Sequence, residues 1–259
     1  MLEIIRERWR QGYRTGRFPR EEPTMPPRFR GLVQIHGACP AGCRACESRC
    51  PAGACRLDGN QPVVDLGLCL FCADCAVCPE GRIVLSNDYR MSARRREDLL
   101  VSGKGFSPAG PLAPDMKKLF RRSFKLRQVS AGGCNACEAD CNVLATLVFD
   151  LGRFGIQFVA SPRHADGILV TGPVSENMRT ALLDTYEAVP GPKVVIATGA
   201  CAIGGGPFRD SSEVCNGVDS LLPVDLYIPG CPPQPYTILD GLLRLLDRRG
   251  ERPPAAVKS

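Results

Sequence analysis

Short apolar runs alternate with helical stretches through the second half of the chain. The runs that predict strands are LRQVS, IQFVAS, GILVTGPV, KVVIATGAC and VDLYIPGC. Helical spacing of apolar positions fills the stretches 135–152, 176–188 and 236–249. Apolar strands that alternate with helices are typical of a parallel, doubly wound sheet. The pattern therefore predicts an α/β domain over residues 128–259, with a mostly parallel, flavodoxin-like sheet.

The first 36 residues combine a helical pattern with an extended one. Apolar side chains recur at helical spacing at Leu2, Ile5, Trp9 and Tyr13, and the Pro-rich stretch PREEPTMPPRFRG follows. We expect a short helix and an extended arm over residues 1–36. The helix is either a solvated surface helix or an amphipathic segment that docks on a partner or a membrane surface.

Between the arm and the α/β domain, apolar residues are sparse. Residues 37–106 hold two Cys-rich runs around the link RLDGNQPVVDLG, and their few apolar pairs cannot stabilise such a domain without help from metal ligation. Residues 107–127 contain SPAGPLAPD and then KKLFRRSFKLR, where six basic residues meet no acidic one. We expect this basic linker to be extended unless an anionic surface compensates its charge.

The cysteines are numerous and unevenly spaced. Nine of the fifteen lie between Cys39 and Cys78, a further three fall at Cys134, Cys137 and Cys141, and the rest stand alone. Disulfides would require a secretory route, but the N-terminus has no uninterrupted apolar signal region. We therefore expect a reducing, cytoplasmic compartment. No apolar run reaches the roughly 18 residues of a membrane-spanning helix.

The formal net charge of the chain is +6. A cluster with four thiolate ligands carries about −2, so three such clusters would bring about −6 and leave the loaded protein nearly neutral. The chain also lacks a recognisable nucleic-acid-binding module or basic residues interleaved with aromatic ones. We therefore expect no nucleic acid as a partner.

The two Cys-rich runs both come close to the pattern C-x2-C-x2-C-x3-C-P. The first runs from Cys39 to Cys50 and the second from Cys69 to Cys78, and each is followed by Pro. In this pattern three Cys bind one [4Fe–4S] cluster and the fourth binds the other. The predicted ligands of cluster A are Cys39, Cys43, Cys46 and Cys78, and those of cluster B are Cys50, Cys69, Cys72 and Cys75. These clusters would form a 2[4Fe–4S] ferredoxin-like domain.

Zinc is the alternative, because paired C-x2-C motifs also form tetrahedral thiolate sites. Two four-Cys runs, each followed by Pro, favour clusters over zinc. The first run has one extra residue between its first two Cys, and the second has one fewer before its last, so Cys39 and Cys78 depart from the regular spacing. The spare Cys55 is either a substitute ligand or a buried thiol.

The region from Arg14 to Phe106 resembles the ferredoxin-like subunit of formate hydrogenlyase and of respiratory complex I. The resemblance rests on RTGRFPREEP, FRG, LGLCLFCADC and IVLSNDYRMSARRREDLL. It implies a subunit that relays single electrons between a donor module and the cluster next to a catalytic centre.

Four further cysteines follow predicted strands. Cys134 and Cys137 come after LRQVSAGG, Cys201 after KVVIATGA and Cys231 after VDLYIPG. Loops at the carboxyl ends of parallel strands converge on one crevice, so distant cysteines can form one site. Neighbouring glycines would let the backbone approach a bulky cluster. The strand pattern alone leaves the ligand set open.

Nearly all of residues 128–245 resembles the small subunit of group 4 [NiFe] hydrogenases. The matching stretches are GGCNACE, RFGIQFVASPRHADGILVTGPVSENM, TYEAVPGPKVVIATGACAIGGGPF and IPGCPPQPYTILDGLL. The resemblance implies that Cys134, Cys137, Cys201 and Cys231 bind a proximal [4Fe–4S] cluster. The related complex I subunit has two adjacent Cys in its first ligand motif, so the separation of Cys134 from Cys137 favours the hydrogenase branch.

Together the resemblances imply the fused electron-transfer subunit of a membrane-bound, formate-hydrogenlyase-like [NiFe] hydrogenase, with three [4Fe–4S] clusters and no catalytic residue of its own. The expected partners are a [NiFe] large subunit, antiporter-like or complex I-like membrane subunits, and a donor such as a ferredoxin or a formate or CO dehydrogenase. The expected location is peripheral, on the cytoplasmic side of the inner membrane.

Two alternatives remain open from the sequence. The chain could serve a complex I-like complex that lacks NiFe and drives quinone reduction or ion translocation. It could also be a free-standing ferredoxin-type carrier or sensor, although a cluster at the rim of the sheet is expected to have a covering partner.

Overall fold

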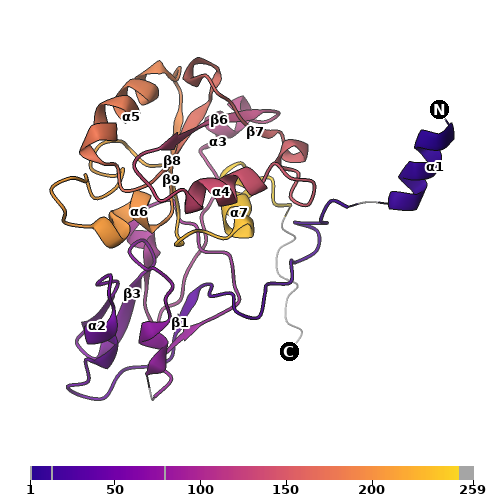
Figure 1. Ribbon diagram of the computed structural model, residues 1–259. Coiled ribbons are helices and arrows are strands. Elements are labelled where there is room, and N and C mark those ends of the chain that lie inside the picture. Colours follow the sequence, from indigo (N-terminus) through magenta and orange to yellow (C-terminus); the bar gives the residue numbers. More distant parts are fainter. Residues whose placement is uncertain (1, 13, 79, 251–259) are drawn as a thin grey trace.

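The computed structural model describes residues 2–12, 14–78 and 80–250 (Figure 1). The predicted position of Tyr13 on the N-terminal helix and the end of the predicted α/β domain, 251–259, lie outside the described residues. Helix α1 (Leu2–Gln11) projects away from the body, and the chain then enters the body as an extended arm. The predicted helix followed by an arm is therefore present in the described part.

A parallel sheet of five strands forms the centre of the second half of the chain. Its strands are β6 (Phe124–Ser130), β7 (Ile156–Phe158), β8 (Gly167–Thr171), β9 (Val194–Thr198) and β10 (Leu226–Ile228). They are ordered β10-β9-β8-β6-β7, and every neighbouring pair is parallel. Counted within this sheet, the order is 2-1-3-4-5, which is the flavodoxin-like order with its switch point between β6 and β8. The predicted fold class is confirmed.

Alternate residues of each strand supply the two apolar faces of this sheet. Leu126, Leu169 and Ile196 face the core that contains α4 (Ala136–Val143) and α7 (Pro235–Leu245). Their neighbours on the strands, such as Val170 and Ala197, face the core that contains α5 (Glu176–Ala188) and α6 (Ala200–Gly204). Strands β8 and β9 are buried along their whole length because helices cover both faces (Figure 1).

Two of the predicted helices are shorter than the apolar pattern indicated. The stretch predicted as 135–152 is helical only to Val143, and a 3₁₀ turn (Leu151–Phe154) ends in Gly155 with a left-handed backbone. Helix α7 ends at Leu245, whereas the pattern extended to 249. Helix α5 has the predicted bounds. The short helix α6 was not predicted, because five residues are too few to show a helical period.

The Cys-rich part forms two small antiparallel sheets. Strands β2 (Cys55–Asp58), β3 (Gln61–Asp65) and β5 (Leu100–Val101) make one, and β1 (Val33–Ile35) with β4 (Ile83–Leu85) makes the other. Between them lie two short helical turns, α2 (Ala45–Arg49) and the 3₁₀ turn η1 (Asp74–Val77). This paired arrangement is consistent with a ferredoxin-like domain.

The Cys-rich part and the parallel sheet share an apolar core. One cluster of buried side chains extends from Val33 and Leu99 to Val129 and Ile203. Ala93 forms an antiparallel bridge with Tyr227 on the edge strand β10, in which each backbone N–H donates to the other residue's carbonyl, at 3.0 and 2.9 Å. The two parts are therefore packed together and not merely tethered.

The basic segment 107–127, expected to be extended unless a surface compensates its charge, contains helix α3 (Pro114–Leu119) and the start of strand β6. Pro114 opens α3, a position where its missing N–H costs nothing. The ring centroids of the buried Phe120 and Phe124 lie 5.1 Å apart, and strand β6 begins at Phe124. Lys117 Nζ lies 2.6 Å from a carboxylate oxygen of Asp247, a partner 130 positions away that the local sequence does not reveal.

The junction provides a test of the shared core. A Cβ on Gly241 of α7 would lie 2.5 Å from Oγ of the fully buried Ser92. We expect Gly241→Ala to lower the free energy of unfolding by about 1–3 kcal/mol through overpacking. Gly110→Ala is the control, because a Cβ there meets nothing within 4 Å. Denaturant unfolding of both variants, purified anaerobically, checks this; equal stability would show that the junction is loose.

Candidate metal centres

Four predicted ligands lie at the carboxyl edge of the parallel sheet. Cys134 lies in the loop after β6, and Cys137 lies in the first turn of α4. Cys201 lies in the first turn of α6 after β9, and Cys231 follows β10. The loops of the last two are joined directly, because the backbone N–H of Ala200 donates to the carbonyl of Gly230 at 2.8 Å. The parallel topology therefore gathers cysteines that are far apart in the sequence.

The thiols of these four residues influence one another. Burial raises the pKa of Cys201 to about 11, with further increases from Cys231 and Cys134. Burial is the main cause of the raised pKa of Cys137, and the charges of Glu138 and Cys201 raise it further. An ionised thiol in such a group is repelled by its neighbours, and a positively charged metal core would relieve that repulsion.

Two glycines provide the space that the thiols need. A Cβ on Gly199 would lie 2.6 Å from Sγ of Cys137, and a Cβ on Gly206 would lie 2.6 Å from Sγ of Cys201. Gly199 also has a φ of +91°, which few side chains tolerate. Asn135, between the first two cysteines, has a φ of 69° and turns the chain into α4. The backbone here is shaped around sulfur atoms, which fits a bulky thiolate-bound group.

Glu138, next to Cys137, is a buried carboxylate with two hydroxyl partners. The hydroxyls of Ser130 and Thr171 each donate to its Oε1 at 2.6 Å. Burial acts to raise the pKa of Glu138, but these hydrogen bonds outweigh it, so the pKa is lowered and the group is charged at neutral pH. Ser130 and Thr171 end strands β6 and β8, so the sheet itself holds this charge beside the thiols.

The predicted ligands of cluster A are also brought together. Burial is the main cause of the raised pKa of Cys39. The charges of Cys46, Cys43 and Cys78 raise it further, and Arg82 acts to lower it. Cys46 lies in α2 and Cys78 caps the 3₁₀ turn η1. The residues with irregular spacing in the sequence, Cys39 and Cys78, therefore lie with the other two.

The predicted ligands of cluster B surround one apolar hollow. Its cysteines are Cys50, Cys55, Cys69, Cys72 and Cys75. Burial raises the pKa of Cys69 to about 12 and that of Cys75 to about 11. Backbone N–H groups already point at two of the sulfurs: Phe71 donates to Cys69 Sγ at 3.3 Å, and Ala54 donates to Cys50 Sγ at 3.2 Å. Such bonds favour a charged sulfur, which suits thiolate ligands.

Three cysteines outside the predicted sets have different surroundings. Cys55 is buried beside Cys46, and burial is the main cause of its raised pKa. Cys141 is fully buried in the apolar core under α7, as expected for a buried helix residue. Cys215 donates to Oε1 of Glu176 at 3.2 Å. His164 lies with Lys118 and Asp166 at a basic cleft.

A single metal ion does not fit these groups. Within the described ranges, no three His, Cys, Asp or Glu side chains are placed to hold one ion. A zinc site needs four sulfurs about 2.3 Å from one atom, whereas a cubane holds each sulfur on a different iron. The grouped thiols offer the donor atoms that a [4Fe–4S] cluster uses.

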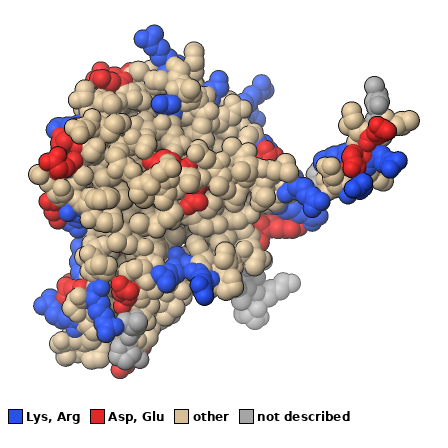
Figure 2. Space-filling view, viewed as in Figure 1, with Lys and Arg blue, Asp and Glu red and all other residues tan. Residues whose placement is uncertain are grey.

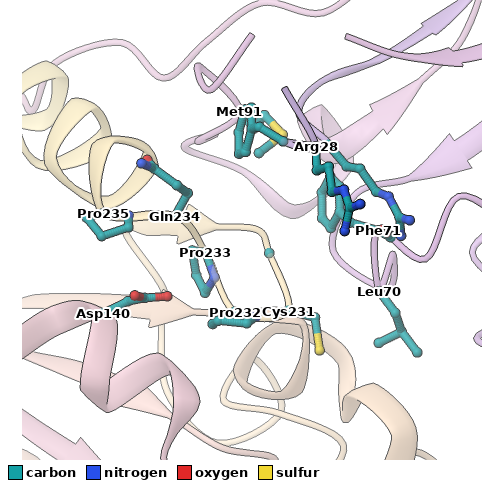
Figure 3. Close-up of a pocket in the computed structure, with 13 residues that line it drawn as sticks. Arg28, Leu70, Phe71, Met91, Asp140, Cys231, Pro232, Pro233, Gln234 and Pro235 are labelled. Carbon is teal, nitrogen blue, oxygen red and sulfur yellow. Dashed lines mark hydrogen bonds between the residues drawn. The ribbon is translucent and has the colours of Figure 1, made fainter. Parts of the chain in front are cut away.

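A cavity of about 370 Å³ separates the candidate cluster B loop from the loop of Cys231 (Figure 3). Leu70 and Phe71 border it on one side, and Cys231 with the prolines that follow it borders the other. Arg28 reaches the cavity from the N-terminal arm. The loop between Cys69 and Cys72 and the loop of Cys231 thus lie on opposite walls of one space.

Sequence reasoning missed several residues of these sites. Gly206 has a φ of +55° and makes the closest approach to Cys201, but it lies in the run GGG, where no single glycine stands out. Ser130 and Thr171 are partners of Glu138 only because β6 and β8 are neighbours in the sheet. Arg30 donates to the Cys72 carbonyl at 2.6 Å, and 42 positions separate the two. Gly199 approaches the Cys137 thiol, whereas Gly230 packs on Pro233.

The fold and the sites define an α/β protein of flavodoxin-like strand order, with a thiol-rich site at the carboxyl edge of its sheet. Residues 134–245 match the family model described as NADH ubiquinone oxidoreductase, 20 Kd subunit. This match begins at Cys134 and includes all four cysteines of that edge. The match covers the parallel sheet from β7 to β10 and leaves β6 and the Cys-rich part outside.

Three curated relatives share this region. The probable membrane-bound hydrogenase subunit mbhJ of Pyrococcus furiosus is 42% identical over 53% of this chain and 85% of its own length. Formate hydrogenlyase subunit 7 of Escherichia coli is 45% identical over 50% of this chain and 51% of its own length. An NADH-quinone oxidoreductase subunit of Geotalea uraniireducens is 47% identical over 46% of this chain and 69% of its own length.

The chain belongs to this family of hydrogenase and complex I subunits. Its relatives are subunits of oxidoreductase complexes. The chain spans about half the length of the formate hydrogenlyase subunit, and each of these three relatives matches about half of this chain.

The raised thiol pKa values give a test on the metal-free protein. At pH 9 a thiol with a pKa of about 11, as for Cys75 and Cys201, is only about 1% ionised, whereas an ordinary thiol is about half ionised. We expect slow alkylation at pH 9 relative to the same protein in denaturant. Because the pKa values of these thiols are raised in the folded protein, they stabilise the folded state below pH 9, and this stabilisation is lost as the pH rises toward 11. Equal alkylation rates in the two states would contradict these surroundings.

Proposed function

We propose that this chain is the iron–sulfur electron-transfer subunit of a membrane-bound [NiFe] hydrogenase complex. The main support is the position of four cysteines at the carboxyl edge of the sheet: Cys134, Cys137, Cys201 and Cys231. Glycines leave room at two of their sulfurs. The membership of this region in a family of hydrogenase and complex I subunits supports the same assignment.

The proposed ligand sets are those predicted from the sequence. Cluster A takes Cys39, Cys43, Cys46 and Cys78; cluster B takes Cys50, Cys69, Cys72 and Cys75; and the proximal cluster takes Cys134, Cys137, Cys201 and Cys231. Three [4Fe–4S] clusters would supply one-electron transfer between a donor and a NiFe site in a partner. The cysteines bind and space the clusters, Glu138 holds a negative charge beside the proximal set, and the buried core excludes water around Cys69.

A large subunit is the proposed cover of the proximal site. Cys134 and Cys231 are exposed, so this chain alone leaves the rim of the site open to water. Phe208, two positions after Gly206, is also exposed, as are Val143, Leu147 and Val148 at and after the end of α4. Two exposed thiols with the exposed ring of Phe208 close in sequence to Gly206 favour a protein partner over solvent. An open site of this kind does not suit a free-standing carrier.

The alternative is a complex I-like or hydrogenase-related complex without NiFe, which reduces quinone or moves ions. The 47% identity to a subunit of an NADH-quinone oxidoreductase favours it. The separation of Cys134 from Cys137 by two residues favours the hydrogenase instead. Isolation of the native complex and metal analysis of its large subunit decide between them: nickel supports the hydrogenase, and its absence from an active, fully loaded complex supports the alternative.

Iron and sulfide content tests the cluster assignment. We expect about twelve Fe and about twelve acid-labile sulfides per chain in anaerobically purified protein, since three four-Cys sites are proposed. Cys201→Ser should lower both by about four and remove one electron paramagnetic resonance signal. Cys215→Ser is the matched control, because that thiol contacts Glu176 and belongs to no proposed set. Stoichiometric zinc with little sulfide would overturn the proposal.

Helix α1 provides a proposed contact with the membrane surface. No described helix is long and apolar enough to cross a bilayer. Leu2, Ile5 and Trp9 are largely exposed on α1, which projects into solvent (Figure 2). Residues 2–20 contain six Arg and two Glu, so the surroundings of this apolar face are basic. An apolar face with basic neighbours suits the headgroup region of an anionic bilayer. We place the subunit peripherally on the cytoplasmic side of the inner membrane.

Vesicle binding tests this contact. The full-length protein should sediment with vesicles that contain phosphatidylglycerol and much less with pure phosphatidylcholine, because the attraction is partly electrostatic. Replacing both Ile5 and Trp9 with Ser should weaken binding about tenfold or more, given the apolar area removed. Gln11→Ser on the same helix is the control. Unchanged sedimentation of the double variant would show that α1 is not the membrane contact.

A further inference from the structure

The arm that follows α1 is anchored beside the Cys-rich part at Gly31 and Leu32. The backbone N–H of Gly31 donates to the Ser86 carbonyl, and that of Leu32 donates to the Asp88 carbonyl, each at 2.7 Å. A Cβ on Gly31 would lie 2.2 Å from the Asp88 carbonyl oxygen, so only glycine permits this approach. Because the arm is held here, the side chain of Arg30 starts from a fixed point.

Arg30 reaches from this anchor to the loop that carries Cys69 and Cys72. Its Nη1 donates to two carbonyl oxygens of the loop, that of Phe71 at 3.0 Å and that of Cys72 at 2.6 Å. Both bonds come from a charged donor, which makes them stronger than bonds between neutral groups. One arginine thus binds the backbone of a candidate cluster ligand directly.

The loop needs such support because its backbone is strained. Phe71 has a φ of 53° and Ala73 has a φ of 71°, on either side of Cys72. Non-glycine residues in this left-handed region cost free energy and persist where their surroundings hold them. The two hydrogen bonds of Arg30 hold the loop at its strained end, while Phe71 contributes its own N–H to Cys69 Sγ.

The charge of Arg30 is not neutralised by an acidic side chain. Among residues 2–12, 14–78 and 80–250, no carboxylate forms an ion pair with Arg30. Asp140 lines the same cavity, but it makes no hydrogen bond to Arg30. The positive charge therefore lies at the carbonyls of Phe71 and Cys72, in the loop that carries two candidate ligands of cluster B.

We propose that Arg30 is a positioning residue that holds the Cys69–Cys72 loop and raises the reduction potential of cluster B. This inference rests on the proposed function. A [4Fe–4S] cluster with four thiolates changes from about −2 to about −3 on reduction, so a nearby positive charge stabilises the reduced form more. Loss of the charge should therefore make the potential of cluster B more negative and leave the proximal cluster almost unchanged.

A redox titration of the full chain, followed by electron paramagnetic resonance, tests the proposal. Arg30→Gln keeps a donor but removes the charge, and its cluster B potential should shift to a more negative value. Arg30→Lys keeps the charge and should lie between Gln and the wild type. Arg28→Gln is the matched control for arm charge, since Arg28 lines the same cavity without a hydrogen bond to any described residue; its shift should be smaller.

The outcomes separate this inference from the function on which it rests. If the wild type carries no [4Fe–4S] cluster at Cys50, Cys69, Cys72 and Cys75, the cluster assignment itself is wrong. If three clusters are present and Arg30→Gln leaves all potentials unchanged, only the role of Arg30 is refuted. Loss of cluster B in Arg30→Gln with retention in Arg30→Lys supports the role, whereas loss in both variants refutes the contribution of charge.

Discussion

The structure depends on the close approach of three loops at one edge of a parallel sheet. Parallel strands deliver their carboxyl ends to the same side, so the loops after β6, β9 and β10 must share a small volume. Side chains at Gly199 or Gly206 would collide with sulfur, and the thiols repel one another once ionised. Glycine avoids the collision, and a metal core with positive charge would compensate the charge of the sulfurs.

The same balance of charge governs the Cys-rich part in a different setting. There the cysteines lie on α2, on the turn η1 and in the loops on either side of them, beside the core that the two parts share. Each of the two clusters proposed for this part has a nearby cation: Arg82 acts on Cys39, and Arg30 binds the Cys72 carbonyl. Cations beside two clusters and a carboxylate, Glu138, beside the third would separate their reduction potentials in opposite directions.

Much of this arrangement was predictable from the sequence, because the responsible patterns are local. Buried strands such as GILVT are continuous apolar runs, and the Cys spacing marks both ferredoxin-like runs. The pairing of Lys117 with Asp247 and the bonds of Arg30 to the loop of Cys72 could not be predicted, since each joins residues that are distant in the sequence. The same holds for the basic segment 107–127: its local charge indicates an extended chain unless an anionic surface compensates it, whereas Phe120 and Phe124 pack in a core that the rest of the chain provides.

The bridge between Ala93 and Tyr227 has a consequence for how the two parts work together. If they were separate proteins, the distance between their cysteines would vary with an association equilibrium, and dilution would part them. Here the backbone of one part is hydrogen-bonded to the edge strand of the other, and a common core lies beneath. Their effective concentration is therefore fixed by covalent structure, and every molecule carries both parts in a one-to-one ratio whatever its abundance in the cell.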